Sequence, residues 1–195
     1  EYLKFTIDSI KKNSSKNNFE ILLHINEGSD GTLDYAKHNN FRYTHSKTNI
    51  GLCSSINQIC KISNYDYLLY SHDDMYFCPD WDIVLMNEVK TIGHDNFYLS
   101  ATMIEPNSGH IKFDCGKKPN EFNEKKFLEN YKDFNYYDFQ GSTWAPTLVH
   151  KSIWNKVGGF SEEYFPGVGS DPDFNIKLWN EGIRIFKGLN NFKVY

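Results

Sequence analysis

Apolar residues recur along the chain at two different spacings. Leu3, Ile7 and Ile10 lie at helical spacing and predict an amphipathic helix over residues 2–12. Residues 19–25 form a short apolar run instead, which is typical of a strand. We expect strands over residues 19–25, 41–45, 65–70, 96–104, 143–150 and 183–186, and helices over residues 2–12, 33–38, 51 onward, 79–90, 124–131, 152–157 and 171–182. Such alternation predicts an α/β fold with a largely parallel sheet.

The stretch from Tyr65 to Met75 organises this pattern. Residues 65–70 show almost no alternation, which is typical of a strand buried on both faces. The stretch then becomes polar at His72-Asp73-Asp74. Side chains that follow a strand in this way lie at the carboxyl edge of the sheet, where open α/β sheets bind their ligands. Two adjacent carboxylates repel each other, so a divalent cation holding phosphate oxygens would neutralise them.

Composition and charge narrow the possible classes of protein. The chain has 195 residues, 39% hydrophobic and 24% charged, which suits one globular domain. Its 21 basic and 25 acidic residues give a net charge of -4 and no electrostatic reason to bind nucleic acid or anionic lipid. No apolar run reaches the roughly 18 residues that span a bilayer, so we expect no transmembrane segment and a cytoplasmic location.

The four cysteines indicate a reducing environment. Cys53, Cys60, Cys78 and Cys115 are irregularly spaced and form no C-x-x-C pair. In a chain of this length, that spacing favours reduced, buried thiols over a disulfide framework or a zinc site.

Residues 105–138 are the least regular part of the sequence. Their glycines, lysines and many aromatic residues predict a long ordered loop with one short helix, of the kind that shapes a binding site. We expect His110 and the Lys117-Lys118 pair to lie on a solvated face. Trp144, which follows this region, is expected in the core, with an acceptor-stacking wall as the alternative.

Four sequence blocks resemble those of family 2 glycosyltransferases, in the order that this family uses. They are Asn26-Glu27-Gly28-Ser29-Asp30-Gly31-Thr32, Asn49-Ile50-Gly51-Leu52 with Asn57, Leu69-Tyr70-Ser71-His72-Asp73-Asp74, and Gly158-Gly159-Phe160-Ser161-Glu162 with Ser170-Asp171-Pro172-Asp173. The resemblance implies the GT-A fold, a three-layer α/β/α sandwich with a mostly parallel central sheet. It also implies one domain over residues 1–195 that lacks the family's first strand and a C-terminal continuation.

The first two blocks are similar to the part of the family that binds the nucleotide. The resemblance assigns nucleotide contacts to Glu27, Gly28, Ser29, Asn49, Gly51 and Asn57, and to Asp73 in the third block. A plain strand-to-helix turn, with Asp30 or Thr32 as N-cap, would also account for the first block. Helix capping alone would likewise account for Asn49 and Gly51.

The third block is similar to the family's D-x-D segment. Asp74 matches its last aspartate, which implies that Asp74 binds Mn²⁺ or Mg²⁺ on the diphosphate. His72 stands where the family has the first aspartate. Imidazole ligates manganese but carries no negative charge when neutral, so this departure weakens the expected affinity for metal. The alternative is that Asp73 and Asp74 form a solvated turn.

In the fourth block, Asp171 matches the family's catalytic base, and Asp173 is the second candidate. An inverting transfer needs one carboxylate to take the proton from the acceptor hydroxyl as it attacks the anomeric carbon. An aspartate followed by proline is also typical of an N-cap with proline at the first helical position. Ser170 replaces the family's usual glutamate.

The function implied is sugar transfer from a nucleoside diphosphate sugar to the hydroxyl of a glycan, lipid-linked or protein acceptor. A catalytically inactive domain that binds nucleotide sugar or glycan is the alternative, because His72 and Ser170 stand where the family has acids. A nucleotidyltransferase would need a glycine-rich basic loop that is not seen here. A lectin-like module would need an all-β framework, which the helix and strand alternation opposes.

Overall fold

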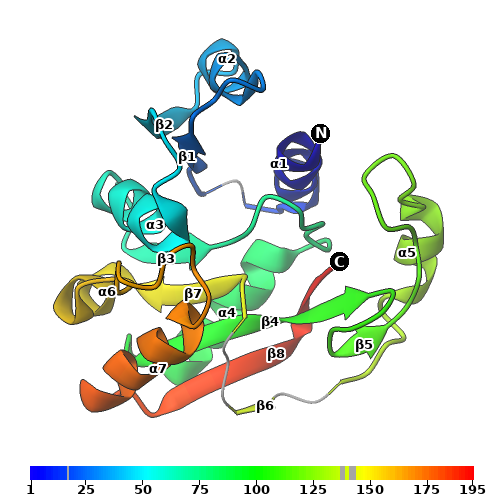
Figure 1. Cartoon of the computed structure of the whole chain (residues 1–195). Helices are drawn as coiled ribbons and strands as arrows, with labels where there is room; N and C mark the ends of the chain where they lie inside the picture. The colour runs from blue at the N-terminus through cyan, green and yellow to red at the C-terminus, as the bar shows by residue number, and fades with distance from the viewer. Residues whose placement is uncertain (17, 137–138, 141–143) are drawn as a thin grey trace. The chain divides into compact units, whose positions relative to one another are not determined.

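The chain folds into two compact units, each assembled from separate segments of the sequence. The computed structural model describes residues 1–16, 18–136, 139–140 and 144–195, with backbone alone at 139–140. Unit 1 comprises Glu1–Asn17, Leu69–Leu148 and Ile185–Tyr195, and unit 2 comprises Asn18–Leu68 and Val149–Arg184 (Figure 1). The chain passes between the units within two strands, β3 (Tyr67–Tyr70) and β7 (Thr147–His150).

Unit 2 contains a small parallel sheet. Strand β1 (Leu22–Asn26) pairs with β2 (Arg42–Ser46), and helix α2 (Thr32–His38) connects them. Helix α3 (Gly51–Lys61) packs against both strands and buries Cys53, Asn57 and Cys60, which share one helical face. Leu23 and Ile25 are the buried residues of β1. The C-terminal part of unit 2 contains α6 (Lys151–Val157) and α7 (Ser170–Asn180), which contact each other.

The larger sheet is mixed and has β4 at its centre. Strand β4 (Phe97–Glu105) pairs in parallel with β8 (Ile185–Val194) and with the two-residue strand β5 (Ile111–Lys112), and antiparallel with β7. Strand β6 (Phe139–Gln140) is antiparallel to β8. The strand order is β3-β7-β4-β8-β6. The parallel character expected of the sheet is therefore only partly present.

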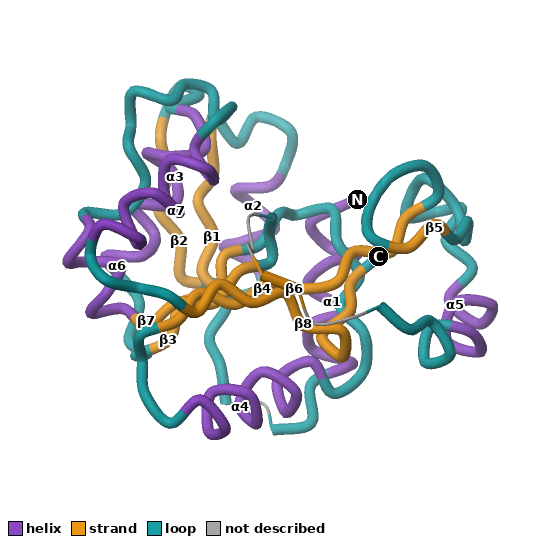
Figure 2. The backbone as a smooth tube through the Cα atoms, turned by 90° about the horizontal axis from the view of Figure 1, so that it is seen from below, coloured by secondary structure: helices purple, strands orange, loops and turns teal. Residues whose placement is uncertain are grey.

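Three helices lie in the described part of unit 1. They are α1 (Tyr2–Asn13), α4 (Trp81–Ile92) and α5 (Glu124–Asn130). Helix α4 packs along one face of β8, which Figure 2 shows clearly, and the Lys187–Glu88 ion pair of 2.8 Å joins the two elements. At its start, Asp82 accepts hydrogen bonds from the Ser14 hydroxyl and from the amides of residues 15, 16 and 83. This carboxylate fixes the end of α1 to the start of α4.

Aromatic packing orders much of the irregular segment 105–136. The buried residues of this aromatic cluster include Phe127, and partly buried aromatic side chains pack against the cluster. Tyr195 fixes the segment further, because its hydroxyl accepts from the Cys115 amide at 2.8 Å and donates to the Gly116 carbonyl at 2.6 Å. The predicted short helix is present as α5, whereas β5 was not predicted. Residues 137–138, which end the predicted loop, and residue 143, which begins a predicted strand, lie outside the described residues.

Two predicted strands differ from the structure. Leu68 and Tyr70 of β3 are buried while Tyr67 and Leu69 are partly exposed, so the prediction of a strand buried on both faces is wrong. The reason is that β3 lies at the end of the strand order with one neighbour, whereas β4, between two strands, is buried almost throughout. The final strand, expected over 183–186, runs from Ile185 to Val194, because pairing with β4 overrides its polar residues.

Candidate active site

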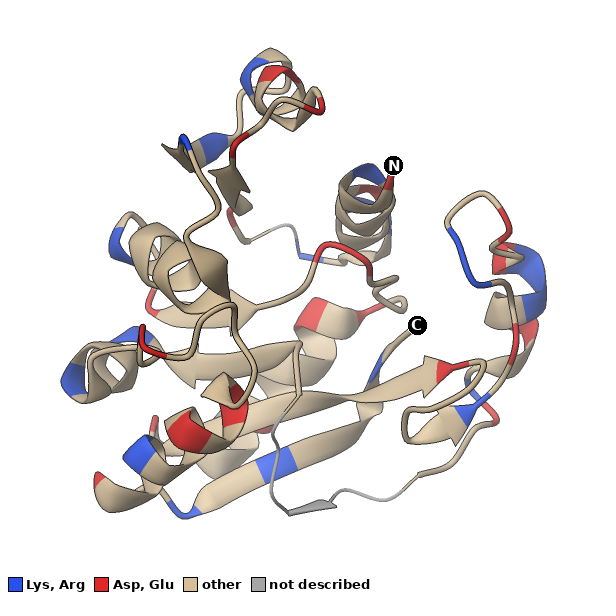
Figure 3. Cartoon of the chain, viewed as in Figure 1, with Lys and Arg blue, Asp and Glu red and all other residues tan. Residues whose placement is uncertain are grey.

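The predicted site residues fall into two groups, one in each unit. Unit 2 contains the nucleotide candidates of the first two blocks and both candidate bases, Asp171 and Asp173. Unit 1 contains His72, Asp73 and Asp74. Acidic residues mark the segment after β3 and the first turn of α7 (Figure 3).

The end of β1 presents Glu27 on an unusual backbone. Glu27 and Gly28 both have positive φ angles, 61° and 74°. A Cβ atom on Gly28 would lie 2.9 Å from Cβ of Leu33, so this position accepts only glycine. A positive φ at a glutamate is uncommon, and such outliers cluster at functional sites. The backbone around it is held by Glu27 N donating to the Ser46 carbonyl at 2.9 Å. The Glu27 side chain is exposed, as is that of Ser29.

The turn that follows is closed locally. Asp30 accepts from the Thr32 amide at 3.0 Å and from the Thr32 hydroxyl at 2.9 Å. These bonds from the Thr32 backbone and side chain lower the pKa of Asp30. The N-cap of α2 is Gly31 rather than Asp30 or Thr32. The capping alternative thus has the wrong residue, although Asp30 does satisfy the first amide of the helix.

Asn26 is an organising residue that the sequence did not reveal. Its Oδ1 accepts from the Ile50 amide at 3.0 Å and from the Ser46 hydroxyl at 2.9 Å, and its Nδ2 donates to the Ser55 hydroxyl at 3.3 Å. One amide therefore joins the ends of β1 and β2 to the start of α3. The available signal was a single polar residue ending an apolar strand, which is common to many strands.

The amino end of α3 is already satisfied by protein groups. Gly51 N donates to Asn49 Oδ1 at 2.8 Å, and Leu52 N donates to the Pro166 carbonyl at 2.8 Å. Gly51 has a φ of 77°, and a Cβ there would lie 2.8 Å from the Phe165 ring. Asn49 and Gly51 thus shape the entry to the helix, but its N-cap is Ile50, whose side chain makes no capping bond, so the capping alternative has the wrong residue.

Asn57 fixes the turn that contains Gly159 and Phe160. Its Oδ1 accepts from Phe160 N at 2.9 Å, and its Nδ2 donates to Phe160 O at 2.8 Å and to Glu162 Oε1 at 3.0 Å. The residue is buried, and a Cβ on Gly159 would lie 2.3 Å from Asn57 Oδ1. Hydrogen bonds from Asn57 and Ser54 lower the pKa of Glu162. The side-chain amide of Asn57 is therefore bonded to Phe160 and Glu162 of the same unit.

The candidate bases lie on the first turn of α7. The helix begins at Ser170 with Gly169 as N-cap, so the alternative that Asp171 is the N-cap is wrong. Asp173 accepts from the Ser161 hydroxyl at 2.6 Å. Asp171 is half-buried near Cys53, whose thiol pKa is raised by burial, lowered by a bond from Ser170 and raised by the charge of Asp171. The amino end of a helix favours carboxylates in both positions.

In unit 1, the acid pair extends from a firmly held segment. His72 Nε2 lies 2.7 Å from the Tyr70 hydroxyl, whereas Asp73 and Asp74 are exposed. The next four residues are buried. Met75 N donates to the Thr6 hydroxyl at 3.0 Å and Phe77 N to the Ser9 hydroxyl at 3.0 Å, both on α1. The acids are thus exposed side chains on a backbone that α1 holds.

The donor set in unit 1 fits a hard divalent cation. Mg²⁺ binds through one or two carboxylates and completes its shell with water and substrate phosphates, and Mn²⁺ accepts the same oxygen ligands. Asp73 and Asp74 supply such oxygens to solvent. No group of three or more metal-binding side chains gathers among the residues that the structure describes.

Two neighbouring predictions have different outcomes. Trp144 is 52% exposed, so placing it in the core is wrong; its ring lies 5.7 Å from that of His110. Lys117 and Lys118 are exposed as expected, but His110 is half-buried, and burial lowers its pKa. The prediction of reduced thiols is confirmed, since all four cysteines are free and buried.

Comparison with solved structures defines the class of fold. The chain matches S. aureus TarS with a TM-score of 0.69 at 14% identity, covering 100% of this chain and 34% of TarS. It matches GalNAc-T7, crystallised with UDP, GalNAc and Mn²⁺, with a TM-score of 0.70 at 12% identity, covering 97% of this chain and 40% of that one. A structure of TarS 1-349 in complex with UDP matches with a TM-score of 0.67 at 13% identity, covering 100% of this chain and 55% of that one. The fold is therefore the α/β fold of GT-A glycosyltransferases, as predicted.

Comparison of the sequence with family models identifies the family. Residues 1–155 match the model of glycosyl transferase family 2, and the chain belongs to this family. It matches no curated protein sequence. Within the described parts of the chain, no helix has both the length and the apolar character needed to cross a bilayer.

Proposed function

We propose that the chain transfers a sugar, with inversion, from a nucleoside diphosphate sugar to an acceptor hydroxyl. The observation that carries this proposal is the family 2 match over residues 1–155. The GT-A neighbours crystallised with UDP support a nucleotide-linked donor. The acceptor is a glycan, a lipid-linked sugar or a protein, and the reaction takes place in the cytoplasm, consistent with four reduced thiols.

The acids of unit 1 hold the donor's phosphates through a metal. Asp74, with His72 beside it, binds Mn²⁺ or Mg²⁺, and Asp73 contacts the nucleotide. A metal held by these residues would supply positive charge beside the diphosphate. The buried segment 75–78 keeps the backbone below these acids in place, so their side chains reorient without moving the chain. His72 keeps one ring nitrogen against Tyr70 and presents the other.

Unit 2 supplies the nucleotide contacts and the base. Glu27, Gly28 and Ser29 form a turn with an exposed carboxylate and an exposed hydroxyl. This turn approaches the nucleobase or the ribose of the donor closely. Asn49, Gly51 and Asn57 shape this part of the site. Asp171 takes the proton from the acceptor hydroxyl, and the hydrogen bond from Ser161 makes Asp173 the less available of the two acids.

The test is turnover by the full chain with UDP-sugars and manganese, followed by the Asp171→Asn variant. We expect turnover to fall at least about 100-fold, the usual contribution of a general base, while nucleotide affinity is unchanged. Glu181→Gln, which removes an acid that forms an ion pair with Lys156 at the far end of α7, is the matched control and should retain full turnover. Undiminished turnover in Asp171→Asn would exclude the assigned role.

A binding domain without turnover is the second candidate. Ser170 stands where the family has an acid, and it is buried with its hydroxyl bonded to the Gly167 carbonyl at 2.7 Å. A thermal-shift series of nucleoside diphosphates with and without manganese measures binding directly, since a ligand stabilises the form that it binds. Stabilisation without turnover on any sugar would favour this candidate.

A further inference from the structure

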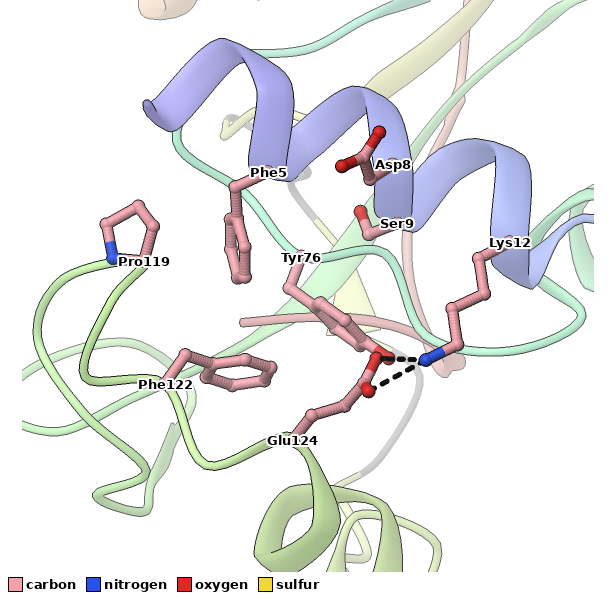
Figure 4. Close-up of a pocket in the computed structure, with 8 residues that line it drawn as sticks. All are labelled: Phe5, Asp8, Ser9, Lys12, Tyr76, Pro119, Phe122 and Glu124. Carbon is pink, nitrogen blue, oxygen red and sulfur yellow. Dashed lines mark hydrogen bonds and ion pairs between the residues drawn. The ribbon is translucent and has the colours of Figure 1, made fainter.

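Unit 1 contains a cavity that the proposed mechanism does not use. Its volume is about 290 Å³, near the lower end of small-molecule sites, which begin at about 300 Å³. It lies between α1, the buried segment after the acid pair and the chain leading into α5 (Figure 4). The lining residues are Phe5, Asp8, Ser9, Lys12, Tyr76, Pro119, Phe122 and Glu124.

One side of the cavity is aromatic. The rings of Phe5 and Phe122 meet edge to face with centroids 5.2 Å apart, and Tyr76 lies 4.8 Å from Phe122. Phe5 and Phe122 are only partly buried, whereas Tyr76 is 2% exposed and sits beneath them. Figure 4 shows Phe5, Phe122 and Pro119 grouped on one side. This side therefore offers apolar faces to a bound molecule.

The other side is a closed polar network. Lys12 Nζ lies 2.7 Å from both carboxylate oxygens of Glu124, and the Tyr76 hydroxyl donates to Glu124 Oε1 at 2.8 Å. The bond from Lys12 is the largest cause of the lowered pKa of Glu124, and burial raises the pKa of the Tyr76 phenol. Lys12 lies in the last turn of α1 and Glu124 in the first turn of α5, where the helix dipoles favour these charges.

The charges around the cavity select against an anion. The lining contains one lysine and two carboxylates, and Glu124 neutralises Lys12. Asp8, the second carboxylate, forms an ion pair with Lys4 one helical turn away. A phosphate or carboxylate ligand would meet no uncompensated cation here and would be repelled. A neutral ring with C–H groups on its faces and hydroxyls at its edge suits both sides of the cavity.

We propose that this cavity binds one uncharged sugar unit of the acceptor. The sugar's C–H face lies on Phe5 and Phe122, and its hydroxyls bond to Asp8 and to the remaining N–H of Lys12. Tyr76 follows Asp74 by two residues, so their Cα atoms are at most about 7 Å apart. One lining residue of the cavity therefore lies close to an acid that is proposed to bind the donor. This inference rests on the proposed glycosyl transfer.

The experiment measures sugar binding to the full chain without any donor. Saturation-transfer NMR with glucose, galactose, N-acetylglucosamine, lactose and cellobiose should show saturable binding of at least one sugar. Phe122→Leu and Asp8→Asn should each weaken that binding about tenfold, which corresponds to about 1.4 kcal/mol. Asp8 is exposed, so Asp8→Asn leaves folding intact. Phe134→Leu is the matched control, because Phe134 packs on Phe113 in the same aromatic cluster but does not line the cavity.

Three results would overturn the inference: no binding of any of these sugars, binding that both cavity variants leave unchanged, or equal weakening by Phe134→Leu. Turnover and manganese-dependent nucleotide binding are read separately. Loss of sugar binding with turnover intact removes only this inference. Sugar binding in a chain without turnover on any donor removes the proposed transfer and leaves the sugar site.

Discussion

The candidate residues of the two units differ in what their polar atoms contact. In unit 2, Asn49 and Asn57 direct their amides at the chain, and Asn57 is buried. In unit 1, Asp73 and Asp74 face solvent on a backbone that other residues hold. The two asparagines of unit 2 therefore build the turns around them, whereas the two acids of unit 1 leave their carboxylates open to solvent. Substitutions of these asparagines should therefore lower the free energy of unfolding, whereas substitutions of these acids should affect ligand binding.

The largest effect on stability is expected for Asn57→Ala. The substitution leaves the buried N–H and C=O of Phe160 without partners, and each such group costs about 1–3 kcal/mol. We expect the free energy of unfolding to fall by about 3 kcal/mol, measured by urea denaturation. A fall below about 0.5 kcal/mol, the usual limit for surface changes, would contradict a building role for this residue.

A smaller effect should distinguish the two adjacent glycines of the same turn. Gly159→Ala places a methyl group 2.3 Å from Asn57 Oδ1, whereas a Cβ on Gly158 meets nothing within 4 Å. Both have positive φ, 77° and 67° for Gly158 and Gly159, so the backbone cost is shared. We expect Gly159→Ala to cost about 2 kcal/mol more than Gly158→Ala in urea denaturation. Equal losses would show that the turn is not held against Asn57.

The building role can also be tested in unit 1 at Asp82. Burial raises its pKa, but hydrogen bonds from Ser14 and three backbone amides outweigh this and lower it. A lowered native pKa stabilises the fold above the unfolded value of about 3.9, and this stability is lost as pH falls through the native pKa. We expect Asp82→Asn to cost about 1.5 kcal/mol at neutral pH and to flatten the acid limb of a pH-stability curve. An unchanged acid limb would contradict this account.

The smallest effect on stability is expected for Asp74→Asn. The side chain is exposed, so the free energy of unfolding should change by less than about 0.5 kcal/mol. Manganese-dependent stabilisation by UDP should nevertheless disappear in a thermal-shift assay. Asp80→Asn, another exposed acid of unit 1, serves as the control and should retain that stabilisation. Persistence of the manganese effect in Asp74→Asn would move the metal site elsewhere.

The sequence predicted the helices better than it predicted the extent of the last strand. Helical spacing placed α1, α3 and α4 closely, because each has an apolar stripe whose period depends on nearby residues alone. Strand β8 was predicted too short, since Gly188, Asn190 and Asn191 interrupt its apolar pattern, whereas the pairs that Leu189 and Lys193 form with β4 continue the strand across a register shift. Local propensity contains no information about a partner that lies far along the chain.

The roles of the asparagines show the same limit. Asn57 lies on an apolar helical face, where a sequence gives no sign that the backbone of Phe160, 103 residues later, requires its amide. Asn26 was passed over for the same reason, because its partners are on β2 and α3. Conversely, the exposed acids after β3 were predicted from their immediate neighbours. The candidate ligand-binding acids were visible from local sequence, and the residues that hold the backbone through distant partners were not.

The position of β8 constrains the order in which unit 1 is made. This strand leaves the ribosome after every other described element of the unit, yet it lies between β4 and β6. Thr102 of β4 therefore waits 87 residues for the Leu189 carbonyl that its hydroxyl bonds. Until then β4 has an open edge that any extended segment can occupy, including that of another nascent chain. A chaperone that shields β4 during translation would raise the yield of native protein.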